Sequence, residues 1–173
     1  MNRYLFVIDY QNDFVDGALG FPGAEKLDEK ISAKVRAYGK DHVLFTRDTH
    51  FENYLQTREG RNLPVPHCIR GTKGWEIIPQ LTEYTQGRTI VDKPTFGSWE
   101  LADMVARLAE EEELEITLCG LCTDICVVSN ALLLKAYFPE VPMQVDAACC
   151  AGVTPQSHKN ALEAMKMCQI IIK

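Results

Sequence analysis

The sequence predicts an α/β fold of three layers, αβα, around a mainly parallel sheet. Short runs of apolar and often β-branched residues alternate along the chain with segments of helical periodicity. Strands buried on both faces have this composition, and repeated strand–helix units place helices on both sides of a parallel sheet. The chain has 173 residues, the length of one domain, so we expect a single domain spanning residues 1–173.

Six apolar runs are candidate strands. Four are clear and the last two are weaker; in chain order they cover residues 4–8, 43–46, 89–91, 116–118, 141–145 and 170–172. Because polar residues or glycine follow each clear run, we interpret these runs as buried parallel strands.

Three segments between these runs carry apolar residues on one helical face, the spacing of a helix packed on a sheet. The faces consist of Leu27, Ile31, Val35 and Tyr38; of Leu101, Met104, Val105 and Leu108; and of Ala161, Leu162, Met165 and Cys168. Residues 49–74 have no clear period but contain His and Pro. Since a long loop inside one domain is usually functional, we expect a site there.

Charge and hydropathy exclude several classes of partner. The chain carries 18 Lys and Arg against 24 Asp and Glu, a formal charge of -6, so its field repels nucleic acid and anionic membranes. Its apolar runs are far shorter than the roughly 18 to 20 residues of a membrane span. Seven cysteines without paired spacing favour free thiols in a reducing compartment, and we expect a cytoplasmic protein.

Chemically reactive side chains follow the candidate strands, at the edge where an open parallel sheet binds its ligands. Asp9 follows the first run, Asp48 and His50 the second, Lys93 the third, and Cys126 comes after the fourth. Each residue alone has an ordinary explanation as a turn cap, a surface charge or a small buried side chain. Their convergence at one edge favours a catalytic site.

Cys126 is the candidate nucleophile. It falls in the expected first turn of a helix, where the helix dipole favours a thiolate. Asp9 would accept the thiol proton and Lys93 would stabilise the negative charge, while N–H groups of the same turn would receive an oxyanion. Cys122 is four residues away, which excludes a Cys-x-x-Cys redox pair. We interpret four further cysteines as packing residues: Cys119, Cys149, Cys150 and Cys168.

A second group of residues has the chemistry of a metal site. Asp48 and His50 are two apart at an extended strand end, so their side chains point to the same side. Glu59 and His67 follow in the irregular segment. Mixed carboxylate and imidazole ligands suit one divalent transition metal ion such as zinc, iron or manganese. The alternative is that these side chains only cap turns and hydrogen-bond the loop.

Five segments, in this order and at these separations, resemble one family. They are Asp-Tyr-Gln-Asn-Asp-Phe at 9–14, Asp-Thr-His at 48–50, Pro-His-Cys-Ile-Arg-Gly-Thr-Lys-Gly at 66–74, Lys-Pro-Thr-Phe-Gly-Ser-Trp at 93–99 and Gly-Leu-Cys-Thr-Asp-Ile-Cys-Val at 120–127. On these motifs, nearly the whole chain resembles the isochorismatase-like cysteine hydrolases, and within them the nicotinamidases. The resemblance implies the isochorismatase-like hydrolase fold, with a six-stranded parallel sheet.

The resemblance also implies roles for particular residues. It implies a catalytic triad of Asp9, Lys93 and Cys126 and a cis peptide bond between Leu121 and Cys122. It implies an oxyanion hole formed by the N–H groups of Cys122 and Cys126. In the same way it implies metal ligands and substrate-binding residues: Asp48, His50, Glu59 and His67 for the metal, and Phe14, Trp99 and Leu121 for the substrate. The chain departs from the family at residues 63–65, Leu-Pro-Val, where an aromatic residue is usual.

The implied reaction is hydrolysis of a small carboxamide, nicotinamide to nicotinate and ammonia, through a cysteine thioester. The departure at residues 63–65 leaves open a pocket shaped for another substrate. One alternative is a metal-free relative that acts on another small amide, a ureido compound or a vinyl ether. Another is a binding or redox-sensing protein without catalysis. The resemblance further implies that the protein forms a homo-oligomer and that it binds a small-molecule amide as its substrate.

Overall fold

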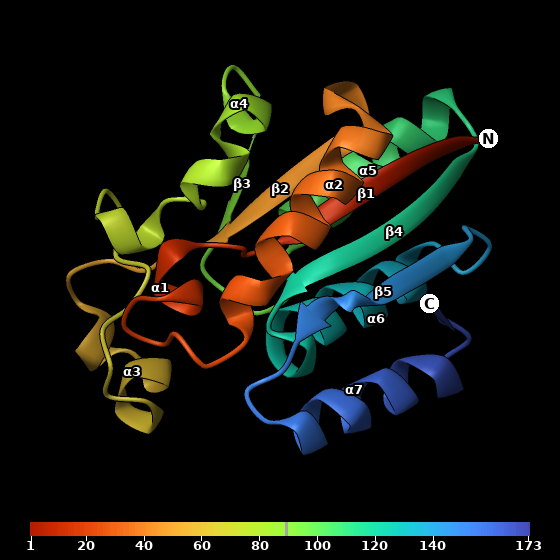
Figure 1. Cartoon of the computed structure of the whole chain (residues 1–173). Coiled ribbons are helices and arrows are strands. Elements are labelled where there is room, and N and C mark those ends of the chain that lie inside the picture. The colour runs from red at the N-terminus through yellow and green to blue at the C-terminus, as the bar shows by residue number, and fades with distance from the viewer. Residues whose placement is uncertain (89) are drawn as a thin grey trace.

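Six parallel strands form one sheet in the order β3-β2-β1-β4-β5-β6 (Figure 1). A computed structural model describes residues 1–88 and 90–173. The strands are β1 (Asn2–Ile8), β2 (Val43–Asp48), β3 (Ile90–Lys93), β4 (Leu114–Leu121), β5 (Met143–Ala151) and β6 (Ile171–Ile172). The predicted six-stranded parallel sheet is confirmed. The third predicted strand began at Thr89, which lies outside the described residues.

The two central strands, β1 and β4, determine where a ligand can bind. They pair from Asn2 opposite Leu114 to Ile8 opposite Gly120, and their apolar side chains are buried. β2 and β3 extend the sheet beyond β1, whereas β5 and β6 extend it beyond β4. The strand order therefore reverses between β1 and β4. A reversal of this kind opens a crevice beyond the carboxyl ends of the two strands.

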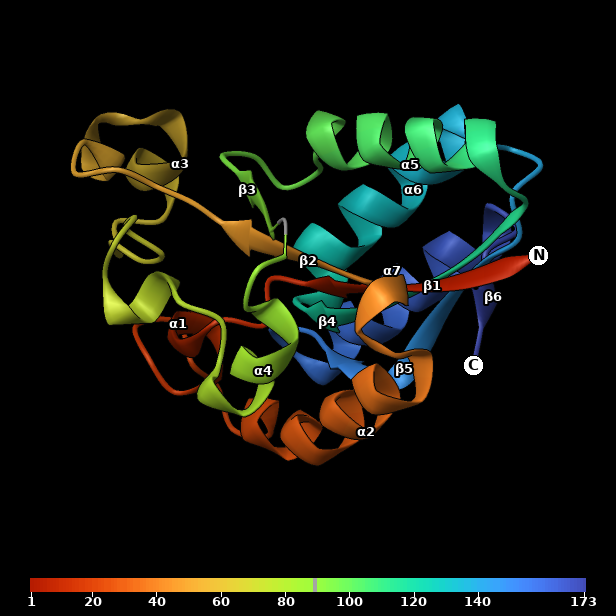
Figure 2. The ribbon, with the colours of Figure 1, turned by 90° about the horizontal axis from the view of Figure 1, so that it is seen from above.

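Helices cover both faces of the sheet, which Figure 2 shows from above. α2 (Asp28–Tyr38) and α4 (Thr82–Thr85) lie on one side, and α5 (Trp99–Glu111), α6 (Val128–Tyr137) and α7 (Pro155–Met167) lie on the other. The predicted three-layer α/β architecture is thus present. Among the described residues, no helix combines the length and apolar character that crossing a bilayer requires.

The predicted apolar helix faces are largely buried. Ile31 of α2, Val105 of α5 and Met165 of α7 are fully buried. Cys168 is an exception, because α7 ends at Met167 and Cys168 follows it as an exposed C-cap. Its interpretation as a packing residue was wrong. The other three cysteines assigned to packing are buried: Cys119, Cys149 and Cys150.

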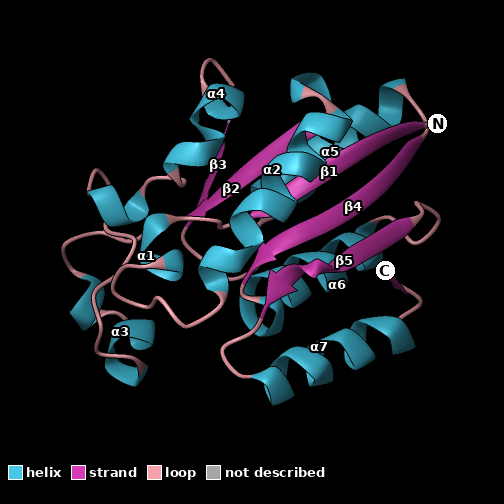
Figure 3. Cartoon of the chain, in the orientation of Figure 1, coloured by secondary structure: helices cyan, strands magenta, loops and turns pink. Residues whose placement is uncertain are grey.

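Residues 49–74 are more ordered than their lack of periodicity suggested. They contain a 3-10 turn at Tyr54–Gln56 and the short helix α3 (Arg58–Asn62), whose N-cap Thr57 accepts a hydrogen bond from Gly60 N at 2.9 Å. α3 and α1 (Asn12–Val15) lie beyond the ends of the strands, as the colouring by secondary structure in Figure 3 makes clear. The segment is therefore a folded wall at the carboxyl edge of the sheet.

Gly120 occupies a position in β4 that only glycine fits. Its φ is 116°, and a Cβ at this residue would lie 2.1 Å from the carbonyl oxygen of Ile8. Backbone oxygen cannot move away as a flexible side chain can. The close approach of β4 to β1, just before the residues of the crevice, therefore requires this glycine.

We predict that Gly120→Ala lowers the free energy of unfolding by about 2 to 4 kcal/mol, measured by urea denaturation. The matched control is Gly39→Ala, because Gly39 has a φ of 77° but open space around a new Cβ. The control isolates the cost of the backbone angle, about 1 kcal/mol. Equal destabilisation by the two substitutions would contradict the close approach.

Candidate active site and metal site

The crevice beyond β1 and β4 contains a cavity of about 480 Å³. Its polar lining includes Asp48, Glu59, His67 and two cysteines, Cys122 and Cys126. Phe14, Leu19, Leu63, Phe96 and Ile125 contribute apolar surface. The sheet edge, the folded segment 49–74 and the turn after β4 thus meet at one cavity.

Lys93, Asp9 and Cys126 are brought together although they are remote in the sequence. Lys93 Nζ lies 2.5 Å from Asp9 Oδ2 and donates a hydrogen bond to Cys126 Sγ at 3.3 Å and to Thr95 O at 3.1 Å. Asp9, Lys93 and Cys126 are buried. Because β2 separates β1 from β3, and neighbouring strands lie about 4.8 Å apart, a long side chain at the end of β3 is needed to reach Asp9.

Asp9 is held from β2 as well as by Lys93. The Thr46 hydroxyl donates to Asp9 Oδ1 at 2.6 Å and accepts a hydrogen bond from Asp9 N at 3.1 Å. Asp9 has a φ of 45°, which is a left-handed backbone conformation. For a residue other than glycine, this conformation costs about 1 to 3 kcal/mol. Residues in such conformations cluster at functional sites, where the surroundings hold them.

The protonation states follow from burial and from the charges of the three groups. Burial raises the pKa of Asp9, although Lys93 opposes this rise. Burial by itself lowers the pKa of Lys93, but Asp9, Cys126 and Asp48 raise it above its usual value. Burial raises the pKa of the Cys126 thiol well above normal, and Asp9 adds to the rise while Lys93 opposes it. Because burial favours the neutral thiol, a base such as Asp9 is needed to make Cys126 a nucleophile.

The turn that carries Cys126 is fixed at both ends. After β4 the Leu121–Cys122 peptide is cis, as the family resemblance implied, and a π-helical turn, Thr123–Val127, leads into α6. Within the described residues, the N–H of Cys122 donates no hydrogen bond. The Asn130 side chain donates to Cys126 O at 2.8 Å and accepts from Ser98 N at 3.0 Å. Asn130 thereby ties the turn to the segment after β3.

The same turn also forms hydrogen bonds with α7 and with the loop that precedes α7. Thr123, which is fully buried, hydrogen-bonds His158 Nδ1 at 2.8 Å. The Asp124 carboxylate accepts from Val153 N at 3.1 Å. The sequence motifs did not single out Asn130 or His158, because neither lies in one of the five segments. Asn130 acts on the turn from the start of α6 and His158 from α7.

Asp48, His50, His67 and Glu59 converge on one point. His50 Nε2 and His67 Nε2 lie 3.1 and 3.4 Å from Asp48 Oδ2. Glu59 Oε1 lies 3.6 and 3.9 Å from the same two nitrogens. Ligands about 2.0 to 2.1 Å from a tetrahedral metal ion lie roughly 3.3 Å apart, so this donor set fits a divalent transition metal ion.

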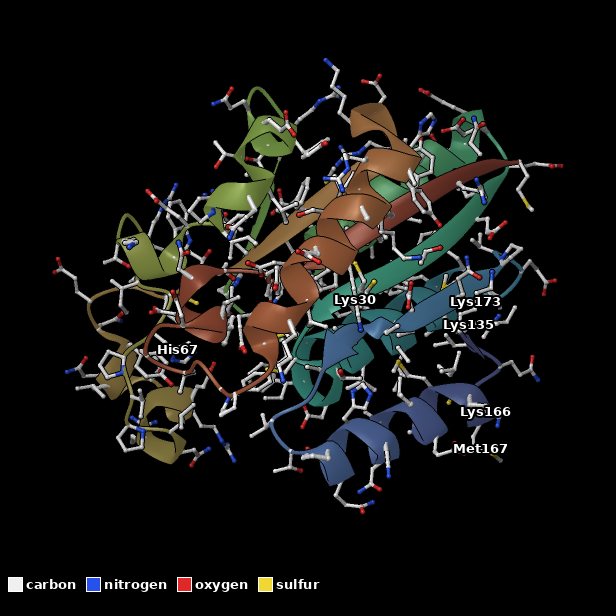
Figure 4. The ribbon with its side chains drawn as sticks, in the orientation of Figure 1. Lys30, His67, Lys135, Lys166, Met167 and Lys173 are labelled. Carbon is white, nitrogen blue, oxygen red and sulfur yellow. The ribbon has the colours of Figure 1, made fainter. Side chains whose placement is uncertain are left out.

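Second contacts orient these donors. His67 Nδ1 donates to Val65 O at 2.8 Å, which leaves the lone pair of Nε2 facing the cluster. Gln11 accepts from Asp48 N at 2.7 Å and donates to Asp48 O at 2.9 Å, so it holds the backbone of that residue. Figure 4 shows the place of His67 in the segment beside α1 and α3. The donors are thus supported from α1 and from the segment itself.

The charges of the cluster are interdependent. Although burial raises the pKa of Asp48, its close contacts with His50 and His67 and the charge of Lys93 lower it below its usual range. Burial raises the pKa of Glu59, opposed by the two histidines. Asp48 Oδ1 also lies 3.9 Å from Lys93 Nζ, which connects the cluster to the Asp9–Lys93 pair.

The residues expected to bind substrate are only partly at the cavity. Phe14 lines it. Trp99 does not: it is 62% exposed and packs edge-on against Tyr137, with 5.5 Å between ring centroids. Trp99 is the first residue of α5, after the N-cap Ser98, whereas Phe96 lines the cavity. Leu121 is fully buried and does not line the cavity. The assignment of Trp99 and Leu121 to substrate binding therefore stays a prediction.

Comparison with known proteins identifies the family. The Isochorismatase domain family matches residues 3–173. The chain belongs to the isochorismatase family. Its relatives include an uncharacterized isochorismatase family protein, PncA of Bacillus subtilis, 31% identical over 94% of this chain and 93% of that protein. The nicotinamidase/pyrazinamidase of Mycobacterium tuberculosis is 26% identical over 97% of this chain and 96% of its own.

One similar protein has been solved with a bound metal ion. The crystal structure of the pyrazinamidase of Pyrococcus horikoshii, in complex with zinc, has a TM-score of 0.81 to this isochorismatase-family chain and 29% identity. The match covers 100% of this chain and 99% of that one. The zinc belongs to that protein. In this chain, the evidence for a metal site is the set of distances among Asp48, His50, Glu59 and His67.

We predict that metal-stripped protein takes up one equivalent of Zn²⁺ and that His67→Ala weakens this binding at least about 100-fold, because it removes a donor oriented by Val65. Competition with a chromophoric chelator measures the affinity. His42→Ala is the control, since His42 packs against Tyr4 instead of the cluster. Unchanged affinity in His67→Ala would refute the site.

Proposed function

We propose that the protein is an amidohydrolase that converts a small, flat, nicotinamide-like carboxamide into its carboxylate and ammonia through a thioester on Cys126. Two relatives in the range above are named for nicotinamidase or pyrazinamidase activity. The observation that carries the proposal is the buried contact of Lys93 with both Asp9 and Cys126. This arrangement supplies a base and a nucleophile beside a cavity.

Asp9 starts the proposed reaction by taking the proton of the Cys126 thiol. Among the described residues, Asp9 Oδ2 accepts no hydrogen bond and only forms the ion pair with Lys93. A lone pair of this oxygen is therefore free to accept the proton. The sulfur then attacks the carboxamide carbon. The N–H groups of Cys122 and Cys126 receive the oxyanion that develops.

Collapse of the tetrahedral intermediate breaks the C–N bond. Asp9 returns the proton to the leaving nitrogen, and ammonia departs while the acyl group stays on Cys126 as a thioester. Water then attacks the thioester while Asp9 accepts one of its protons. The C–S bond breaks, Asp9 passes that proton to the sulfur, and the acid leaves as the thiol re-forms. The sum is amide plus water giving acid plus ammonia. Lys93 remains an ammonium throughout and stabilises each negative charge in turn.

Asp48, His50, His67 and Glu59 are the residues that would hold a divalent ion, zinc before iron or manganese. When bound, the ion supplies a Lewis-acidic anchor for a ring nitrogen or a similar donor of the substrate. Phe14 and Phe96 offer aromatic surface for a flat ring at the same cavity. A metal-free relative would have no use for this oriented donor set, so the metal-dependent hypothesis is preferred.

Replacing the nucleophile or the base is predicted to abolish activity. Cys126→Ala and Asp9→Asn should each lower kcat/KM for nicotinamide at least about 10³-fold, because the first removes the sulfur and the second removes the base that deprotonates it. Ammonia release measures the rate, and circular dichroism checks folding. Cys168→Ala is the control, since Cys168 is exposed at the end of α7. Full turnover by Cys126→Ala would exclude the nucleophile.

We predict that the pH dependence of kcat/KM depends on the hydrogen bond that Thr46 donates to Asp9. Burial already raises the pKa of Asp9, and the Thr46 hydroxyl opposes that rise. Thr46→Val should therefore raise the pKa of Asp9 further and move the acid limb of the kcat/KM profile upward by about 0.5 to 1 pH unit, because activity requires the carboxylate. Thr46→Ser, which keeps the hydroxyl, should leave the limb in place. An unmoved limb in Thr46→Val would mean that another group sets it.

A further inference from the structure

One wall of the cavity carries two polar side chains that the proposed mechanism does not use. Arg58 and Asn62 are the first and last residues of α3, four positions apart, so their side chains lie on the same side of the helix. Both are exposed and both line the cavity. A guanidinium and a carboxamide therefore stand on the same exposed wall of the cavity.

Neither side chain has a partner in the protein. Within residues 1–88 and 90–173, Arg58 and Asn62 make no side-chain hydrogen bond and Arg58 makes no ion pair. Two other arginines are engaged: Arg47 pairs with Asp92, and Arg61, also on α3, donates to Gln56 O at 2.6 Å. Glu59, beside Arg58 in the sequence, lies with His50 and His67 instead.

The charge of Arg58 faces a cavity in which other charges have partners. Asp48 and Glu59, the carboxylates of its lining, lie beside His50 and His67, and outside that lining Asp9 and Lys93 pair with each other. The same cavity has apolar lining from Leu63, which follows Asn62 in the chain, and from Leu19 and Phe96. An exposed cation with free donors at an apolar wall suits an anionic group of a ligand whose body is apolar.

The size of the cavity leaves room for such a group. Its volume of about 480 Å³ lies within the roughly 300 to 1,000 Å³ of sites that take drug-sized ligands, so a single ring with one carboxamide does not fill it. Arg58 presents a planar fork of donors that matches the two oxygens of a carboxylate, and Asn62 adds a further donor. The geometry thus favours a carboxylate over a compact, uncharged substituent.

We propose that Arg58 and Asn62 form a specificity subsite, and that the preferred substrates are flat aromatic carboxamides bearing a second, anionic group, a carboxylate remote from the amide that is cleaved. This inference rests on the proposed amidohydrolase function and narrows its substrate class. Arg58 binds the carboxylate and Asn62 supports it. Neither residue touches the reacting carbon.

The experiment compares 5-carboxynicotinamide with 5-acetylnicotinamide, which has nearly the same shape and no charge, on metal-loaded wild type, Arg58→Gln and Arg61→Gln. The ratio of kcat/KM for the acid over the ketone should be about ten or more in wild type, the effect of one charge-assisted pair. Arg58→Gln should bring this ratio close to one, mainly through KM, and leave nicotinamide turnover within about three-fold. Arg61→Gln, on the same helix but away from the cavity, should retain the wild-type ratio.

A binding measurement keeps the inference testable whatever the outcome of catalysis. Calorimetry with pyridine-3,5-dicarboxylate and nicotinate should give about ten-fold tighter binding of the dicarboxylate to wild type, lost in Arg58→Gln and retained in Arg61→Gln. If no amide is hydrolysed, the proposed function fails and this comparison alone decides the subsite. Equal preference in wild type and Arg58→Gln, in either assay, would overturn the subsite and leave the amidohydrolase proposal untouched.

Discussion

Burying the ammonium group of Lys93 requires negative and hydrogen-bonding partners, and Asp9, Cys126 and Thr95 supply one for each of its three donors. Removing one partner of a buried ion pair costs about 3 to 5 kcal/mol, because the remaining charge is left without compensation. The ends of β1 and β3 must therefore stay in register across β2. Thr46 of β2 fills the gap between them and bonds the carboxylate.

This buried charge also connects the two halves of the site. Asp48 ends β2 opposite Lys93 of β3, so one carboxylate contacts His50 and His67 on one side and lies 3.9 Å from the ammonium on the other. A change in charge at the histidine cluster therefore alters the electrostatic environment of Asp9, because Lys93 lies close to both Asp48 and Asp9. The reversal of strand order places both groups at the same crevice, so that one substrate can meet both.

The sequence predicted what depends on strand order and residue type. Asp9 and Lys93 directly follow or end parallel strands, so their meeting follows from the alternation of strands and helices. It could not predict features set by packing in three dimensions. Burial raises the pKa of the Cys126 thiol, and the residue pattern does not show how deeply that thiol is buried. Packing also decides that Phe96 lines the cavity while Trp99 stays exposed at the start of α5. The homo-oligomer remains a prediction.

The central claim is that the charge arrangement around Lys93 makes Cys126 the atom that carries the acyl group. Rapid acid quench of the protein during turnover of nicotinamide, followed by peptide mass spectrometry, measures this directly. The account predicts a nicotinoyl adduct on the peptide that contains Cys126, present during turnover and gone after substrate is exhausted. Ammonia release with no adduct on Cys126, or with an adduct on another cysteine, would contradict it.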